Sequence, residues 1–101
     1  MKYSHNYFKL MEQDYTTIRR YSKGKIGDII TETYPNGKHK AKIVKIERKT
    51  LDNLEDLFLY KDTGCSERED SYKIIQSFYK KPIDFENEKF YIYYLEKEAE
   101  S

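Results

Sequence analysis

The sequence predicts a single α+β domain whose sheet closes on itself around a thin, aromatic-rich core. The chain has 101 residues, which is room for one core. Although 37% of the residues are charged, the chain has 11 Tyr and 5 Phe, far more than a disordered chain carries. β-rich segments come first, two helical segments follow, and an apolar segment ends the chain. We expect one domain over residues 1–101, with residues 96–101 frayed.

Short elements open the chain. Residues 7–11 place apolar groups on one side and fit either a short helix or a strand. Residues 16–20 are β-rich and predict a short strand. Residues 23–28 contain two glycines, each free to take positive φ, and predict a loop.

A β-hairpin is the clearest local signal. Residues 29–34 read as a strand, and the Pro35-Asn36-Gly37 segment supplies the turn. Asn-Gly predicts a type I′ turn, with positive φ at both residues. In the second strand the alternation slips at Ile43-Val44, after which Val44 and Ile46 are expected on the same side as Ala41 and Ile43. One extra residue in a strand indicates a β-bulge, which would bend the hairpin.

Two helices and a final strand complete the chain. Residues 52–55 resemble a capping box, and the expected buried stripe of the first helix is Leu54, Leu57 and Phe58. Residues 62–65 are expected to join the helices. Ser66-Glu67-Arg68-Glu69 is a second capping box, and the helix that it opens has the apolar face Tyr72, Ile75, Phe78 and Tyr79. Lys81-Pro82 is expected to end it.

Residues 90–95 are all apolar or aromatic, so both faces of this segment should be covered. We therefore predict a central strand that pairs with the strand containing Thr17 to Arg19, or with its hairpin neighbour.

Cysteine, histidine and hydropathy patterns exclude several classes of site. Cys65 is the only cysteine, so neither an intrachain disulfide nor a cysteine metal site can form. His5 and His39 have no partners at metal-ligand spacing, and surface histidines are the expected interpretation. We expect no metal and no cofactor. Because no apolar run follows the N-terminal residues, we expect no signal peptide, and no apolar run is long enough to cross a membrane; a cytoplasmic protein is the expected interpretation.

Charge is distributed unevenly along the chain. Residues 17–49 hold ten basic and three acidic residues, a balance of +7. Residues 50–101 hold seven basic and thirteen acidic residues, a balance of −6. Such asymmetry indicates either a face that binds a polyanion or two halves that attract each other within one domain.

The order of motifs resembles the ASCH domains of the PUA-like superfamily. The matching features extend over about 85 residues: Thr17-Ile18-Arg19, Gly27-Asp28, residues 41–46, Thr50-Leu51-Asp52, residues 72–79, and Phe90-Tyr91-Ile92. The resemblance implies a partly open β-barrel with a two-helix insert packed against it. It also implies that the protein binds RNA, single-stranded nucleic acid or a nucleotide in a basic cleft between barrel and helices.

The most similar members of that family are small bacterial acetylcytidine amidohydrolases, which use a Lys base, a Thr nucleophile and a Glu. The resemblance places Thr17 at the nucleophile. Asp14 stands where those proteins have the Lys, and the Glu position falls at or next to Thr63, beside Asp62. Lys9 or Lys23 is the candidate to replace the missing Lys. Because a Thr hydroxyl needs a neighbouring base, binding without catalysis is favoured over hydrolysis of a modified nucleoside or RNA.

Individual residues carry the binding hypothesis, each with a structural alternative. Arg19 either grips a phosphate or forms an ion pair with Asp28, which is itself expected to orient backbone amides. Thr17 is either functional or an ordinary strand residue. Tyr21 and Tyr34 either stack on bases or belong to the core or surface. The predicted ligand-binding set is Arg19, Arg20, Tyr21, Lys23, Lys25 and Lys40, with Arg19, Lys23 and Lys25 at the mouth of the cleft and Thr17 at its floor.

A purely protein-binding adaptor is the third possibility, because charge asymmetry also suits a protein partner.

Overall fold

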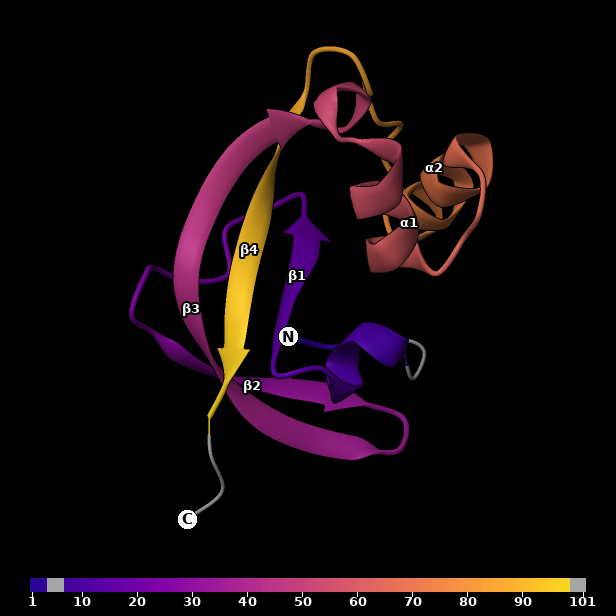
Figure 1. Cartoon of the computed structure of the whole chain (residues 1–101). Helices are drawn as coiled ribbons and strands as arrows, with labels where there is room; N and C mark the ends of the chain where they lie inside the picture. The colour runs from indigo at the N-terminus through magenta and orange to yellow at the C-terminus, as the bar shows by residue number, and fades with distance from the viewer. Residues whose placement is uncertain (4–6, 99–101) are drawn as a thin grey trace.

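The computed structural model describes residues 1–3 and 7–98 of the chain (Figure 1). The elements in chain order are a 3₁₀ helix η1 (Phe8–Met11), β1 (Asp14–Arg19), β2 (Ile29–Tyr34), β3 (Gly37–Thr50), a 3₁₀ helix η2 (Leu51–Asn53), α1 (Asp56–Thr63), α2 (Arg68–Ser77) and β4 (Lys89–Lys97). The predicted order of β and α segments is confirmed, and residues 7–11 are helical rather than extended. His5 and residues 99–101 of the expected frayed end lie outside the described residues, whereas Glu96 and Lys97 of that end are paired in β4.

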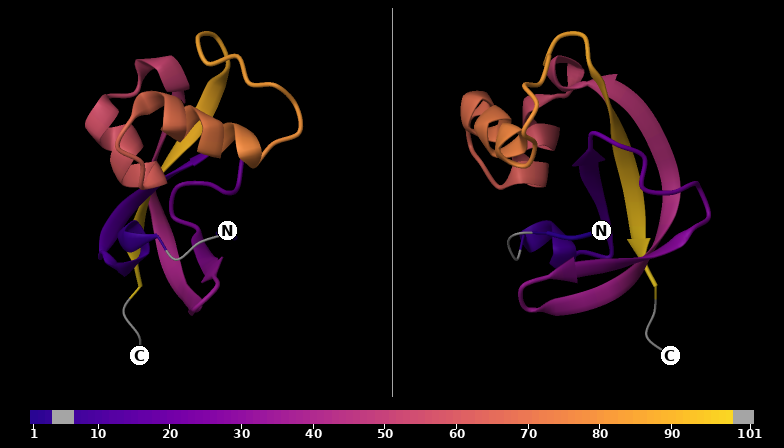
Figure 2. Two further views of the ribbon diagram at one scale, coloured as in Figure 1. Left: turned by 90° about the vertical axis from the view of Figure 1, so that its right-hand side faces the viewer. Right: turned by 180° about the vertical axis from the view of Figure 1, so that it is seen from behind.

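The four strands form an open antiparallel sheet in the order β1-β4-β3-β2. β4 lies between β1 and β3, and Thr17 pairs with Tyr93 in the β1–β4 register. The prediction that the last strand is internal to the sheet is therefore confirmed. Figure 2 shows from two sides that α1 and α2 lie together beside one end of this sheet, near the start of β4.

β4 is covered on both faces by different parts of the core. Phe90 and Ile92 belong to a cluster with residues of α1, α2 and η2. Tyr93 and Leu95 point to the opposite face and pack with Tyr15 and other residues of β1, β3 and the N-terminal segment. This arrangement explains why the segment has no polar alternation, since successive side chains of a strand point to opposite faces.

β3 is long and bent at a bulge (Figure 1). Its first part pairs with β2 and its second part with β4, and the register shifts between Ile43 and Lys45. The predicted bulge is confirmed. Its side-chain directions are only partly as expected, because Val44 is the extra residue and is 43% exposed, whereas Ile46 packs against the core. A bulged residue is left out of the alternation that its neighbours keep.

The N-terminal segment extends the sheet past β2. The Tyr3 amide donates to the Thr33 carbonyl at 2.8 Å, and the Thr33 amide donates to the Met1 carbonyl at 2.7 Å. On the other side, the Arg19 guanidinium at the end of β1 donates to the Lys2 carbonyl at 3.3 Å. Residues 1–3 therefore lie between the two edges of the curled sheet.

The helices begin and end differently from the prediction. α1 begins at Asp56 without a side-chain cap. The helix buries a different face from the predicted one: Leu57 is 80% exposed, and Leu59 is buried instead. Asp62 and Thr63 belong to this helix, which ends at Gly64 with φ 79°. α2 begins at Arg68, and the side chain of its N-cap residue, Glu67, makes no capping hydrogen bond.

The second helix also ends before the predicted proline. Its last residue is Ser77, and Phe78 turns outward with 45% exposure. Gln76 holds the chain that follows: its side chain donates to the Tyr79 and Lys81 carbonyls at 3.1 and 2.9 Å, and accepts from the Ile83 amide at 2.8 Å. These local bonds hold the chain between the end of the helix and Ile83.

The hairpin turn is centred one residue earlier than predicted. Tyr34 pairs with Gly37, so the loop consists of Pro35 and Asn36. Among the described residues only glycines have positive φ, and Asn36 therefore does not. The type I′ prediction is wrong because Pro35 occupies the first loop position and its ring holds φ at about −65°. Gly37 follows the loop with φ 157°.

Replacing Gly37 with Val is expected to lower the free energy of unfolding by ~1–3 kcal/mol, because side chains other than hydrogen rarely tolerate such a φ. Urea denaturation followed by circular dichroism measures the change. Lys38→Val is the matched control at the next strand position, where Val is favoured and the expected change is under ~0.5 kcal/mol. Similar losses in both variants would show that the backbone conformation at Gly37 is not the cause.

A buried polar cluster lies under the hairpin. Glu32 is fully buried and accepts hydrogen bonds from the Tyr3 hydroxyl at 2.7 Å and the Tyr15 hydroxyl at 2.9 Å. The Tyr15 hydroxyl also lies 2.7 Å from Nε2 of His39, which is half-buried between Tyr15 and Tyr34. The expectation of a surface histidine at His39 is therefore wrong, because the Tyr-rich strands cover its ring.

The free energy of unfolding is expected to decrease as the pH is lowered below about 6.5, in part because of His39. Burial lowers the pKa of His39, the charges of Lys97 and the terminal amino group lower it further, and Glu32 opposes them. The unfolded chain therefore takes up this proton at higher pH than the folded one. His39 contributes stability above its unfolded pKa, and that contribution is lost as pH falls.

His39→Gln should flatten this dependence between pH 7.5 and 5.5 relative to the wild type, measured by urea unfolding at each pH. Parallel pH profiles for the two proteins would contradict a role for this histidine.

Candidate functional site

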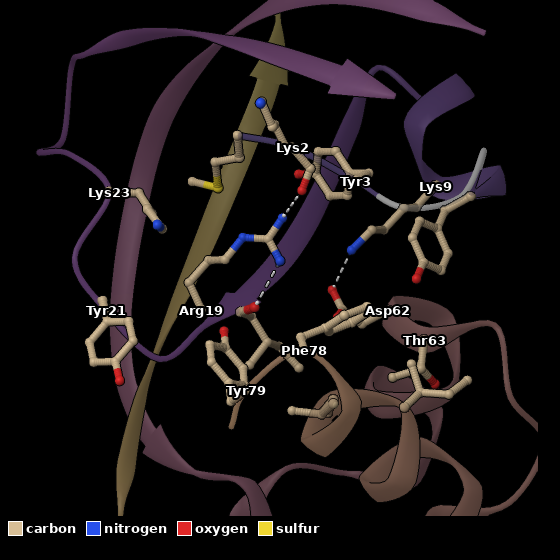
Figure 3. Close-up of a pocket in the computed structure, with 15 residues that line it drawn as sticks. Lys2, Tyr3, Lys9, Arg19, Tyr21, Lys23, Asp62, Thr63, Phe78 and Tyr79 are labelled. Atoms are coloured by element: carbon tan, nitrogen blue, oxygen red, sulfur yellow. Dashed lines mark hydrogen bonds and ion pairs between the residues drawn. The ribbon is translucent and has the colours of Figure 1, made fainter. Parts of the chain in front are cut away.

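A cavity of about 720 Å³ lies between the edge strand β1 and the two helices (Figure 3). Its walls come from the N-terminal segment, η1, the end of β1 with the loop after it, α1 and α2. Small-molecule sites typically have volumes of about 300–1,000 Å³. The cavity is thus large enough for one nucleotide-sized ligand.

One end of the cavity holds a buried ion pair. Lys9 comes from η1 and Asp62 from the last turn of α1, and their Nζ and Oδ1 atoms lie 2.8 Å apart. Both side chains line the cavity and are less than 10% exposed. Burial lowers the pKa of Lys9, and the Asp62 carboxylate opposes that effect. Beside them, Lys61 and Glu12 form an exposed ion pair of 2.9 Å that joins the same two elements.

The Arg19 guanidinium occupies the middle of the cavity in Figure 3. It lies 4.9 Å from the centre of the Tyr3 ring, and its two hydrogen bonds go to the carbonyls of Ile18 and Lys2 at 3.4 and 3.3 Å. In the described part of the chain no carboxylate forms an ion pair with it. Both carbonyl bonds are long, so the charge is available to an anionic ligand.

The expected alternative partner of Arg19 is engaged elsewhere. An Asp28 carboxylate oxygen accepts from the Lys25 amide at 2.9 Å and closes the loop before β2. This is the backbone-orienting role predicted for Asp28.

Lys23 and Tyr21 lie on the side of Arg19 away from Lys9 and Asp62, whereas Phe78 lies between Tyr79 and Asp62 (Figure 3). Lys23 is exposed, and its amide is anchored by the Tyr93 hydroxyl at 2.6 Å. Tyr21 is 57% exposed and meets Tyr79 edge to face, with 6.1 Å between ring centres. The exposed rings of Tyr21 and Phe78 border the cavity and offer faces for stacking.

Three of the six predicted ligand-binding residues, Arg19, Tyr21 and Lys23, line this cavity. Arg20 does not, because its guanidinium pairs with Glu88 at 2.6 Å and donates to the Lys81 and Pro82 carbonyls. It anchors the loop before β4. Lys25 is exposed on the loop, and Lys40 is exposed on β3; neither is among the cavity residues.

Thr17 is fully buried and does not line the cavity. Its position in β1 points to the same side as Tyr15, away from Ile18 and the helices. Its Oγ1 has no hydrogen-bond partner of ordinary geometry in the described structure. The predicted floor of the cleft is therefore formed by other residues.

Lys9, Asp62, Tyr3 and Phe78 are among the cavity residues that the predicted binding set does not include. The family resemblance suggests Lys9 only as a replacement for the missing lysine, and Lys9 does lie beside Asp62. One sequence signal for it exists: it is a lone charge in the apolar stretch Phe8-Lys9-Leu10-Met11. Tyr34 contacts His39 rather than the cavity. Cys65 is free and half-buried after α1.

Two further properties concern the described residues as a set. Residues 1–3 and 7–98 contain no group of three or more His, Cys, Asp or Glu side chains placed to hold a metal ion. None of the helices in that part of the chain has the length and apolarity to cross a membrane.

Comparison with known proteins identifies a relative but no family. The chain is 42% identical over 67 residues to an uncharacterized protein of Methanocaldococcus jannaschii, a match that covers 61% of this chain and 59% of that protein. The chain thus spans less than two thirds of the relative's length. No family model matches the chain, and no solved structure shows significant similarity to it.

Proposed function

We propose that this chain is an RNA- or nucleotide-binding domain of the PUA-like, ASCH type, a partly open barrel that receives one nucleotide in the cavity beside β1. The observation that carries the proposal is the position of Arg19, whose guanidinium faces a nucleotide-sized cavity with no carboxylate paired to it in the described structure. The ligand is either a free nucleotide or one unit of single-stranded RNA, which share this chemistry.

The cavity offers what each part of a nucleotide needs. The planar fork of Arg19 can bind a phosphate with two hydrogen bonds, and Lys23 and Lys2 add point charges nearby. Aromatic side chains bind bases with little sequence preference, because every base has a π face. Tyr21 and Phe78 provide such faces at the rim. Together these groups support anion binding and base stacking in one place.

The test is binding of a short fluorescent single-stranded RNA, measured by anisotropy over a range of salt concentrations. Affinity should fall as salt rises, with a slope of about −0.7 per phosphate contact. Arg19→Ala with Lys23→Ala should weaken binding and make that slope shallower by about 1.4, since two contacts are lost.

Lys25→Ala with Lys40→Ala is the matched control, because it removes two exposed lysines that lie outside the cavity. Its affinity and slope should stay near those of the wild type. Equal effects of the two double variants would contradict the cavity as the binding site. Absence of any binding would favour the protein-binding adaptor instead.

A hydrolase acting on a modified nucleoside is the second candidate, and the buried Lys9–Asp62 pair favours it. Burial lowers the pKa of Lys9. At neutral pH a larger fraction of such a lysine is neutral, and therefore able to act as a base, than of an exposed lysine. In the reaction, water adds to the acyl carbon of the modified base and the C–N bond breaks, which releases a carboxylic acid and the free amine.

Incubation with acetylcytidine tests this activity. Turnover that is lost in Lys9→Met but kept in Thr17→Ala would identify Lys9 as the base. Loss of turnover in Thr17→Ala would instead identify Thr17 as the nucleophile, which is the role that the family resemblance implies. Absence of turnover in the wild type would exclude this activity on acetylcytidine.

A further inference from the structure

We propose that Lys9 and Asp62 read the edge of the bound base and select guanine. This inference rests on the proposed nucleotide-binding function and adds a specificity to it. It assigns the buried ion pair at one end of the cavity to recognition of the base, and Arg19 and Lys23 to recognition of the phosphate.

The position of the pair supports this assignment. Figure 3 shows Lys9 and Asp62 together on one side of Arg19, with Tyr21 and Lys23 on the other. A nucleotide whose phosphate lies near Arg19 and Lys23 can therefore extend its base toward the ion pair, where Phe78 provides the stacking face. Tyr21 at the opposite end is left for a neighbouring base of an RNA. The rings of Tyr3 and Tyr7 lie 5.5 and 5.6 Å from the Lys9 ammonium and provide apolar surface around the base.

The burial of the pair gives it discriminating power. Lys9 is 5% exposed and Asp62 is 8% exposed, and both residues line the cavity. Buried charged groups reject a ligand that leaves them without hydrogen bonds, because the lost interactions are not replaced by water. A base that fills this end of the cavity must match the donors and acceptors of the pair.

Guanine has the complementary pattern. Its N1–H and N2–H groups lie side by side and can both donate to one carboxylate, whereas the adjacent O6 accepts from an ammonium group. Asp62 has a second carboxylate oxygen beyond the one that accepts from Lys9. The Lys9 ammonium has three N–H donors, of which the described structure shows one bonded, to Asp62.

The other bases match less well. Adenine offers a single amino group beside an acceptor, and cytosine does the same, so each leaves one carboxylate oxygen facing a ring nitrogen. Uracil has one N–H between two carbonyls, which would place a carbonyl against the carboxylate. Each of these mismatches puts two acceptors together in a site with little water.

The first experiment compares monophosphates on the unmodified protein by isothermal titration calorimetry. Guanosine monophosphate should bind most tightly. Inosine monophosphate lacks only the 2-amino group and should bind ~10-fold more weakly, and the adenosine, cytidine and uridine monophosphates ~10- to 100-fold more weakly. Because ribose and phosphate are shared by all five, these ratios report recognition of the base alone.

The second experiment changes one residue of the pair that contacts the base. Asp62→Asn keeps an oxygen that can accept from Lys9 but replaces the other with an amide donor. The variant should lose its preference for guanosine monophosphate and gain one for xanthosine monophosphate, whose C2 carbonyl accepts from that amide. Glu12→Gln is the matched control, because it changes the exposed neighbouring pair with Lys61 outside the cavity and should keep the guanine preference.

The outcomes separate the two proposals. Binding of all five monophosphates with affinities within about threefold would overturn guanine selection and leave the proposed function standing. Binding of none of them, and of no RNA, would overturn both. If Asp62→Asn does not fold, the ratio of guanosine to inosine monophosphate affinity on the wild type decides the question.

Discussion

Replacing Asp62 with Ala is expected to lower the free energy of unfolding by ~3–5 kcal/mol, a large part of the ~5–15 kcal/mol that holds a domain of this size together. The substitution leaves the Lys9 ammonium, which is 5% exposed, without its carboxylate partner. An uncompensated buried charge either stays charged at high cost or loses its proton. Guanidinium chloride denaturation followed by tyrosine fluorescence measures the loss.

Two variants distinguish the contribution of the ion pair to stability from the contribution of side-chain packing. Lys9→Met combined with Asp62→Leu removes both charges and should recover most of the stability, because a buried pair is often replaceable by apolar residues of similar size. Lys61→Ala breaks the exposed pair with Glu12 and should change stability by at most ~1 kcal/mol. A loss below 1 kcal/mol in Asp62→Ala would show that water reaches Lys9 in the folded protein.

Replacing Phe90 with Ala is expected to lower the free energy of unfolding by ~3–5 kcal/mol. Phe90 is fully buried at the start of β4, where it packs with the helices and contacts the Tyr79 ring edge to face at 6.1 Å. Removing the ring loses its transfer free energy and leaves a cavity that the surrounding residues fill only in part. Urea denaturation with circular dichroism gives the difference.

Phe78→Ala is the matched control for this substitution. It removes the same side chain from a position that is 45% exposed at the rim of the cavity. Its effect on stability should be under ~1 kcal/mol, whereas binding of RNA should weaken through the lost stacking surface. If Phe78→Ala destabilised the protein as strongly as Phe90→Ala, the rim would have a structural role rather than a binding role.

The fold was predictable where the sequence has a strong local or periodic signal. Residues 90–95 have no polar alternation, and only an internal strand covered on both faces satisfies that pattern. The bulge at Val44 was visible as a slip in alternation. The helix boundaries were less predictable, because Ser66 and Glu69 resemble a capping box but the helix begins at Arg68, whose guanidinium donates to the Leu51 and Leu54 carbonyls.

The site was predictable only in part. Arg19, Tyr21 and Lys23 lie at the end of β1 and just after it, so proximity in sequence brought them together at one cavity. Lys25 and Lys40 share the same positive segment but face elsewhere, since charge counts carry no direction. Arg20 follows Arg19 by one position but lies just past the end of β1, and its side chain pairs with Glu88 rather than entering the cavity.

The sequence by itself determined the α+β order, the central last strand, the bulge and the positive character of the segment around β1. These follow from periodicity and composition, which act over a few neighbouring residues. Only the tertiary structure decided that Lys9 meets Asp62 across 53 positions of the chain, and that Thr17 is buried away from the cavity. Such contacts depend on how η1 and α1 are placed on the sheet, and no local pattern records that placement.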